Sequence, residues 1–272
     1  HNAVLPRSRR VRFAGLDLYG MYNSIAEVLA YLDQVDPEAA ALARRRYGCL
    51  TPWQHDPSTY GRAALTGAYR SCEDDVVEML QDLLARRIED ARAGDEHVFD
   101  AIQNARLVAG AEAYYRAMYY GAAHSWNLRD QHMFQTLEAL LAFHGGDARA
   151  VVWAHNSHVG DATATEMSAR GELNIGQLCR QRFGASAYSV GFGTDHGTVA
   201  AASCWGGPME VKRVRAALDG SYERLCHDTG IGGFFLPLRT PRRALLRKVL
   251  TEQRLERAIG VMYRPETERA SH

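Results

Sequence analysis

The sequence predicts an α/β protein: a three-layer α/β/α core with a parallel or mixed sheet and a large inserted helical subdomain. Two observations predict this fold. Short uninterrupted apolar runs, such as residues 150–154, are typical of strands that are buried on both faces of a parallel sheet. Three long helical patterns stand between two such runs, which is more than an ordinary crossover connection contains.

The first part of the expected core covers residues 1–66. Residues 11–18 are the predicted first strand, with Asp17 near its carboxyl end. Residues 22–35 carry apolar side chains at helical spacing, so a helix is expected to follow the strand. Residues 36–67 mix prolines and glycines with a short alanine-rich helix, and we expect them to cross the surface.

The expected helical insert covers residues 67–146. Apolar side chains recur at helical spacing in three stretches, which are residues 73–88, 99–118 and 126–143. The rest of the core, residues 147–272, is expected to alternate strands and helices. The predicted strands are residues 150–154, 187–192, 198–204 and 258–263. The predicted helices are residues 173–183, 221–227 and 242–257.

Composition excludes several classes of protein. The chain has 32 basic and 32 acidic residues, so no net field favours nucleic acid or an anionic membrane. No apolar run reaches the roughly 18 residues of a membrane span, and no signal peptide opens the chain. Five widely spaced cysteines without a Cys-x-x-Cys pattern argue against a disulfide framework and indicate a reducing compartment. We therefore expect a cytoplasmic protein, whose oligomeric state the sequence leaves open.

The strongest candidate site follows the apolar run 150–154, where His155 and His158 stand three residues apart. Ligands of open α/β sheets bind beyond the carboxyl ends of such strands. The pair suits a general base with an orienting partner, or two metal ligands with Asp161 as a third. The simpler interpretation is a turn in which the histidines cap backbone groups. We favour catalysis and expect no cofactor, with the metal as the minor alternative.

A serine nucleophile at this site is disfavoured. The chain has no Gly-x-Ser-x-Gly elbow, the turn that carries the nucleophile of α/β hydrolases. Ser157 stands beside His158, and adjacent residues of an extended backbone point to opposite faces. Water activated by histidine is therefore the expected hydrolytic chemistry.

Arg129 is the second candidate catalytic residue. It lies four residues before Met133 and so continues the apolar stripe of its helix inward, with His132 one turn further on. A guanidinium in a core needs a carboxylate or a ligand anion, since an unpaired buried charge is costly. Asp17, Asp130 and a substrate oxyanion are the candidate partners. The alternative role is an ion pair that locks the insert to the sheet.

Four residues are expected to contact the substrate rather than to carry the reaction. They are Asp17, His132, Asn156 and Glu166. Glu166 fits a second interpretation equally well, because its segment also looks like the solvated start of a helix.

Seven motifs resemble those of the erythromycin esterase family. They are Gly-Leu-Asp-Leu-Tyr (15–19), Gln-Asn-Ala-Arg (103–106), Asn-Leu-Arg-Asp-Gln-His-Met (127–133), Trp-Ala-His-Asn-Ser-His-Val-Gly-Asp-Ala (153–162), Gly-Glu-Leu-Asn-Ile-Gly-Gln-Leu (171–178), Gly-Thr-Val-Ala-Ala-Ala (197–202) and Arg-Pro-Glu-Thr-Glu-Arg (264–269). The similarity extends over nearly the whole chain. It is closest to bacterial homologues that also carry the description succinoglycan biosynthesis protein.

The resemblance implies a three-layer α/β/α core with a helical insert, and hydrolysis of an ester by histidine-activated water without an obligatory metal. His155 and His158 would line the cleft, with Arg129 and Asp17 shaping it. The substrate would be a small-molecule ester of the macrolactone type, which connects the family with antibiotic resistance.

The chain departs from the family at one point. The amino-terminal Gly-Glu and the histidine that follows it, regarded as the general base, have no counterpart here. The chain therefore resembles the central and carboxyl-terminal portion of a family member, and alone it is expected to be a poor esterase. A non-catalytic domain that binds a small ligand or a metal in the same cleft is the alternative function.

Overall fold

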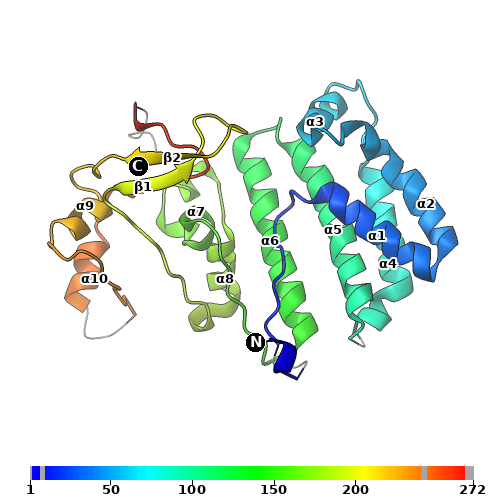
Figure 1. Ribbon diagram of the computed structural model, residues 1–272, viewed down its shortest axis with the longest axis horizontal. Helices are drawn as coiled ribbons and strands as arrows, with labels where there is room; N and C mark the ends of the chain where they lie inside the picture. Colours follow the sequence, from blue (N-terminus) through cyan, green and yellow to red (C-terminus); the bar gives the residue numbers. More distant parts are fainter. Residues whose placement is uncertain (1, 7–9, 93, 240–243, 267–272) are drawn as a thin grey trace. The chain divides into compact units, whose positions relative to one another are not determined.

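The computed structural model describes residues 2–6, 10–92, 94–239 and 244–266 (Figure 1). The chain divides into two compact units, which are described separately below. The first unit comprises His1–Trp153 and His158–Ser189, and the second comprises Ala154–Ser157 and Val190–His272. No helix in the described ranges combines the length and the apolar character that crossing a membrane requires.

The first unit is built from helices. Its long helices are α1 (Met21–Val35), α2 (Pro37–Tyr47), α3 (Pro57–Leu65), α4 (Glu73–Arg92), α5 (Glu96–Ala117), α6 (Ala122–His144) and α8 (Ile175–Phe183). Short 3₁₀ turns occupy Asn2–Val4, Gly48–Trp53, Ala162–Ala164, Ser168–Arg170 and Gly184–Ser186. One helical turn, α7 (Asn156–Val159), contains the boundary between the units. The helices that the sequence predicts at residues 22–35, 73–88, 99–118, 126–143 and 173–183 are confirmed within a few residues.

Aspartates begin three of these helices. Asp36 and Asp56 each precede a proline at the first helical position, and their carboxylates accept hydrogen bonds from Ala39 N and Ser58 N. Asp95 caps α5 in the same way. A side-chain oxygen at this position satisfies an amide that has no partner inside the helix, and proline is already set to the helical φ. Local sequence therefore determines where these helices start.

Helix α5 lies at the centre of the first unit and packs against α1, α3, α4 and α6. Its buried side chains point in nearly every direction, because neighbours cover most of its circumference. They are Val98, Phe99, Ala101, Ile102, Ala105, Val108, Ala111, Glu112, Tyr114, Tyr115 and Ala117. The only charged member of this set is Glu112, which is 1 % exposed.

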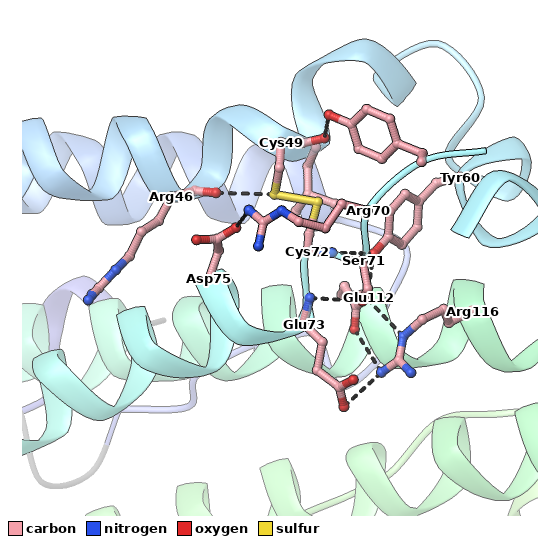
Figure 2. The surroundings of a disulfide bond; sticks show 12 residues. Arg46, Cys49, Tyr60, Arg70, Ser71, Cys72, Glu73, Asp75, Glu112 and Arg116 are labelled. Carbon is pink, nitrogen blue, oxygen red and sulfur yellow. Dashed lines mark hydrogen bonds and ion pairs between the residues drawn. A yellow bond between two sulfur atoms is a disulfide. The ribbon is translucent and has the colours of Figure 1, made fainter. Parts of the chain in front are cut away.

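Glu112 is satisfied by a local network (Figure 2). Its Oε1 accepts hydrogen bonds from the Tyr60 hydroxyl at 2.5 Å and from Arg116 Nε at 2.9 Å. The Tyr60 hydroxyl in turn accepts the backbone amide of Cys72 at 2.8 Å. Because a buried carboxylate without partners is costly, these bonds tie α3 and the start of α4 to α5.

The second unit contains the only strands assigned among the described residues. Strands β1 (Gly197–Ala201) and β2 (Glu210–Val214) form an antiparallel pair, and Ala202 makes an isolated parallel bridge to Met262. Helices α9 (Tyr222–His227) and α10 (Ala244–Leu250) follow. A small core of Ala201, Val214 and Tyr263 holds the pair.

The predicted three-layer α/β/α core is wrong. In the described ranges the sheet has two strands only, and the apolar runs 11–18, 150–154 and 187–192 are irregular or extended backbone. Several of their large apolar side chains are exposed, with 93 % of Trp153 and 78 % of Phe192 accessible, although Leu18 is buried. An apolar run becomes a strand only when a neighbouring strand pairs its amides and carbonyls, and no described segment pairs with these runs. The division into residues 1–66, 67–146 and 147–272 stays a prediction.

One disulfide bond is present, which the argument against a disulfide framework does not predict. Cys49 and Cys72 are bonded to each other, 23 residues apart in sequence (Figure 2). Cys179, Cys204 and Cys226 are free thiols. The bond joins the 3₁₀ turn Gly48–Trp53 to the residue that precedes α4 and closes a loop that contains α3. Sequence spacing carried no signal for this pairing, because the helices that bring the two thiols together belong to the tertiary fold.

Replacing both bonded cysteines with serine tests the role of this bond. Cross-linking a loop of this length lowers the entropy of the unfolded chain, so the Cys49→Ser/Cys72→Ser variant should lose about 3 kcal/mol of unfolding free energy. Urea denaturation of the oxidised and reduced protein measures the loss. The control is Cys204→Ser, an exposed free thiol, which should leave the midpoint unchanged. Equal midpoints for wild type with and without reductant would show that the bond contributes nothing.

Candidate functional site

His158 and Asp130 form a buried pair in the first unit. His158 Nδ1 lies 3.0 Å from both carboxylate oxygens of Asp130, and Asp130 is fully buried. A carboxylate can only accept, so Nδ1 carries the proton and donates. Among the described residues Nε2 makes no hydrogen bond, and 11 % of the side chain is exposed. This arrangement leaves the lone pair of Nε2 available as a base.

Two further contacts hold the pair in position. Asp130 Oδ1 also accepts the backbone amide of Ile175 at 2.9 Å, at the start of α8. The indole of Trp126, one turn before Asp130 on α6, stacks on the imidazole of His158 with ring centroids 4.5 Å apart and planes 6° apart. Trp126 is fixed in turn by a 2.7 Å hydrogen bond from its Nε1 to Leu173 O. Carboxylate and indole therefore define both the tautomer and the plane of the ring.

A glycine allows α8 to approach this site. A Cβ atom at Gly176 would lie 1.9 Å from the carbonyl oxygen of Gly160, so any side chain there would push α8 away from the segment that follows His158. Glycine is used where backbones must come this close. Gly176 thus supports the bond between Ile175 and Asp130.

Arg129 pairs with Asp17, one of the three partners that the sequence left open. Its Nε and Nη2 donate to the two carboxylate oxygens at 2.8 Å and 2.6 Å, the paired geometry that guanidinium and carboxylate groups favour. Burial alone would raise the pKa of Asp17, but the hydrogen bonds and charge of Arg129 outweigh it and the pKa is lowered. His158 lowers the pKa of Asp17 further when its ring is protonated, so this ion pair lies within electrostatic reach of the histidine.

Aromatic side chains surround the guanidinium. Arg129 Cζ lies 4.9 Å from the centroid of the Tyr19 ring, and the hydroxyls of Tyr19 and Tyr114 are 3.1 Å apart. Burial of Arg129 would lower its pKa, yet hydrogen bonding and charge from Asp17 raise it overall. The group is therefore a permanent cation with a polarisable aromatic neighbour.

His132 is partly buried beside the Asp17–Arg129 pair. Burial lowers its pKa to about 4, against the opposing charge of Asp17. Its ring fills the space over Gly110 of α5, where a Cβ atom would lie 2.8 Å from His132 Nδ1. The imidazole is consequently neutral at physiological pH.

His155, Asn156 and Ser157 belong to the second unit. His155 Nδ1 lies 2.9 Å from Ser157 Oγ, and Nε2 lies 2.7 Å from the carbonyl oxygen of Ile259. The amide of Asn156 bonds both the carbonyl and the amide of Phe192, at 2.6 Å and 3.1 Å. Because the carbonyl of Ile259 can only accept, Nε2 of His155 is the protonated nitrogen. The expected joint site of His155 and His158 stays a prediction.

Two other candidates are occupied by local contacts. Asp161 accepts the amide of Thr163 and forms an ion pair with Arg180 Nε at 2.8 Å. Glu166 is 77 % exposed and pairs with Arg170 at the next turn. Glu166 thus has the surroundings of a solvated charge, and Asp161 has those of a helix cap.

Asp130 is the central residue that sequence reasoning missed as a site residue. The sequence predicts it only as a possible partner for Arg129. Asp130 lies three residues before Met133 and seven before Leu137, so it continues the same buried stripe of α6, and Trp126 extends the stripe one turn further. A carboxylate among buried apolar side chains needs a hydrogen-bond partner. The position of Asp130 at helical spacing from Met133 and Leu137 therefore indicates, from sequence alone, that it is buried and paired.

Comparison with known proteins gives two findings. A family model described as erythromycin esterase matches residues 1–272. The fold is similar to a solved structure described as a succinoglycan biosynthesis protein, with a TM-score of 0.60 and 18 % sequence identity. The match covers 82 % of this chain and 52 % of that one, so this chain spans about half the length of that protein.

The low pKa of His132 predicts a pH dependence of stability. Unfolded, its imidazole takes up a proton near pH 6.5, whereas in the folded protein it does so near pH 4. The unfolded state therefore binds more protons in this interval, and the free energy of unfolding falls as the pH drops from about 7 to 4, by about 3 kcal/mol for this group.

A neutral substitution isolates this contribution. His132→Gln should show a shallower fall in unfolding free energy between pH 7 and 4 than wild type does, as measured by urea denaturation across the range. His144→Gln, at the exposed end of α6, is the matched control and should keep the wild-type slope. Parallel pH profiles for wild type and His132→Gln would contradict the buried neutral state.

Proposed function

The chain belongs to the erythromycin esterase family, and from that premise we propose that it is a hydrolase that cleaves carboxylic esters with histidine-activated water. The observation that carries this proposal is the Asp130–His158 pair, with both carboxylate oxygens 3.0 Å from Nδ1. A base whose other ring nitrogen is fixed by a buried carboxylate is the arrangement that general-base catalysis uses.

In the proposed reaction, His158 Nε2 removes a proton from water while the water oxygen attacks the ester carbonyl carbon. Asp130 stabilises the imidazolium that forms, since its carboxylate already accepts the Nδ1 proton. The tetrahedral intermediate then breaks its bond to the alcohol oxygen. The imidazolium returns the proton to that oxygen, so that one ester and one water give one acid and one alcohol.

Arg129 is proposed to bind the carbonyl oxygen as negative charge develops on it. Its Nε and Nη2 are held by Asp17, which leaves the donors of Nη1 for a ligand. A fixed donor that needs no reorientation stabilises an oxyanion most effectively. Asp17 thus shapes the site by orienting the guanidinium.

The remaining predicted residues keep supporting roles in the proposal. His155 is proposed as a second catalytic histidine, supported by its contact to Ser157 Oγ at 2.9 Å. His132, Asn156 and Glu166 are proposed substrate contacts. Of these, His132 has the strongest support, because it lies partly buried beside Asp17 and Arg129.

The proposed substrate is a small-molecule ester, with a macrolactone antibiotic as the specific candidate from the family description. A cytoplasmic location is part of the same proposal. The Cys49–Cys72 bond provides a check on location, because disulfides persist mainly in oxidising compartments. Trapping free thiols in cell extracts would show whether the two cysteines are reduced in the cell.

Asp130→Asn tests the proposed base most selectively. The amide oxygen can still accept the Ile175 amide, but its NH₂ group faces His158 Nδ1 and favours the wrong tautomer. We expect kcat for hydrolysis of chromogenic esters and of erythromycin by the intact protein to fall about 10²- to 10⁴-fold. Circular dichroism should show an unchanged fold.

The matched control is Asp147→Asn, an exposed aspartate after α6, which should retain full activity. His158→Ala should match or exceed the loss in Asp130→Asn. Ester turnover that survives both substitutions would exclude His158 as the base and leave the proposal without its catalytic group.

A further inference from the structure

A second cluster of ligand-type side chains lies in the second unit, and the proposed hydrolysis does not use it. Asp195, His196 and His227 each offer one ligand atom, and these atoms all lie within 4.8 Å of one another. Asp195 Oδ2 is 2.8 Å from His196 Nδ1 and 3.9 Å from His227 Nδ1. Two ligands of a tetrahedral zinc ion, each at ~2.0–2.1 Å from the metal, lie roughly 3.3 Å apart. Small side-chain rotations would therefore bring the three ligand atoms to the separations that a tetrahedral zinc ion requires.

The fold fixes Asp195 firmly. This residue is 9 % exposed, and the Arg257 guanidinium donates to the carbonyl oxygens of Asp195 and Thr194 at 2.6 Å and 3.0 Å. Arg224 Nη1 reaches Asp195 Oδ1 at 3.5 Å, which leaves Oδ2 directed to the two histidines. Carboxylates that bind metals are usually held in this way by donors behind them.

Arg224 brings a positive charge close to the cluster, which taken alone would oppose a cation. Two exposed carboxylates offset it, because Arg224 Nε lies 3.5 Å from Asp219 and 3.4 Å from Asp228. The guanidinium is thus shared among three carboxylates, and its net repulsion of a bound cation is small.

His227 is the last residue of α9, and the start of this helix is anchored. The hydroxyl of the fully buried Ser221 accepts the amide of Arg224 at 3.2 Å. The rings of His196 and His227 meet edge to face, with centroids 5.4 Å apart. Their side chains are 63 % and 45 % exposed, so an ion bound here keeps an open side to solvent.

The buried carboxylate of Glu223 gives independent support for a cation in the second unit, because one of its oxygens has no hydrogen-bond partner among the described residues. It is 6 % exposed, and its Oε1 accepts the amide of Arg257 at 3.0 Å. Its Oε2 is buried without a hydrogen-bond partner among the described residues. Glu223 lies one turn before His227 on α9, and it packs against Gly193, two residues before Asp195. An unsatisfied buried carboxylate oxygen costs free energy that a nearby cation would offset.

We propose that Asp195, His196 and His227 bind one divalent transition-metal ion, for which zinc is the best-matched candidate. Two imidazole nitrogens and one carboxylate oxygen are ligands that zinc accepts, whereas magnesium and calcium prefer oxygen alone. Coordination through His196 Nδ1 replaces the hydrogen bond between Nδ1 and Asp195, and the ring proton is then carried by Nε2, so the ligand is the neutral imidazole. The site differs from the set of His155, His158 and Asp161 that sequence spacing had suggested.

The bound ion would stabilise the second unit by joining the loop before β1 to the end of α9. A small core of three buried apolar residues holds this unit's strands, so a cross-link of this kind would add substantially to its stability. Binding only to the native state raises apparent stability in proportion to the logarithm of metal concentration.

Zinc titration of the intact protein tests the site. The protein is prepared without a polyhistidine tag, treated with a chelator and dialysed, and then titrated with ZnCl₂ by calorimetry. We expect one equivalent of zinc to bind and the unfolding temperature to rise with zinc concentration. Binding of Co²⁺ in its place should give the visible absorption of a low-symmetry site.

Single substitutions identify the ligands. His196→Gln and His227→Gln should abolish the one-equivalent binding, and both positions are exposed enough for the fold to persist. Glu223→Gln should weaken binding, because it removes the negative charge of the buried carboxylate whose Oε2 has no partner among the described residues. His144→Gln, in the first unit, is the control and should bind as wild type does. Absence of stoichiometric zinc binding to wild type, or binding that neither histidine variant weakens, would overturn the proposal.

Discussion

The hydrogen bond between Asp130 and His158 is the contact on which the rest of the site depends. A carboxylate buried to this degree is tolerated only with partners, and Asp130 has two: the His158 ring and the amide of Ile175. The hydrogen bond from the Ile175 amide holds the start of α8 against Asp130 on α6. The hydrogen bond from His158 holds the segment that begins at this residue against the same carboxylate. Trp126 then sets the plane of the ring by stacking on it. Because the buried Asp130 carboxylate needs hydrogen-bond partners, it positions His158, the proposed base.

Helices of the first unit were predictable from sequence, whereas the sheet was not. The apolar side chains of α1, α4 and α6 recur at helical spacing along a continuous stretch, so local spacing is sufficient to detect these helices. A strand depends on a partner that is distant in sequence, and the run 150–154 contains no information about that partner. This run is apolar and unpaired among the described residues, and its Trp153 side chain is 93 % exposed.

The candidate site could be predicted in part. Arg129 was expected to need an anionic partner, and Asp17 is that partner, because the cost of an unpaired buried charge is general. His158 was expected to be a base with an orienting group, but the group lies 28 residues earlier, on α6, and no spacing rule connects the two. The sequence does not predict Asp195, His196 and His227 as one cluster for the same reason, since 31 residues separate the two histidines.

The central claim is that Asp130 holds His158 as the tautomer that carries its proton on Nδ1, with Nε2 unprotonated. Nuclear magnetic resonance of protein labelled with ¹⁵N-histidine measures this directly, because protonated and unprotonated ring nitrogens differ widely in chemical shift. For the neutral ring of His158, we expect a protonated Nδ1 and a bare Nε2. A His158 resonance pattern with the proton on Nε2 would contradict it.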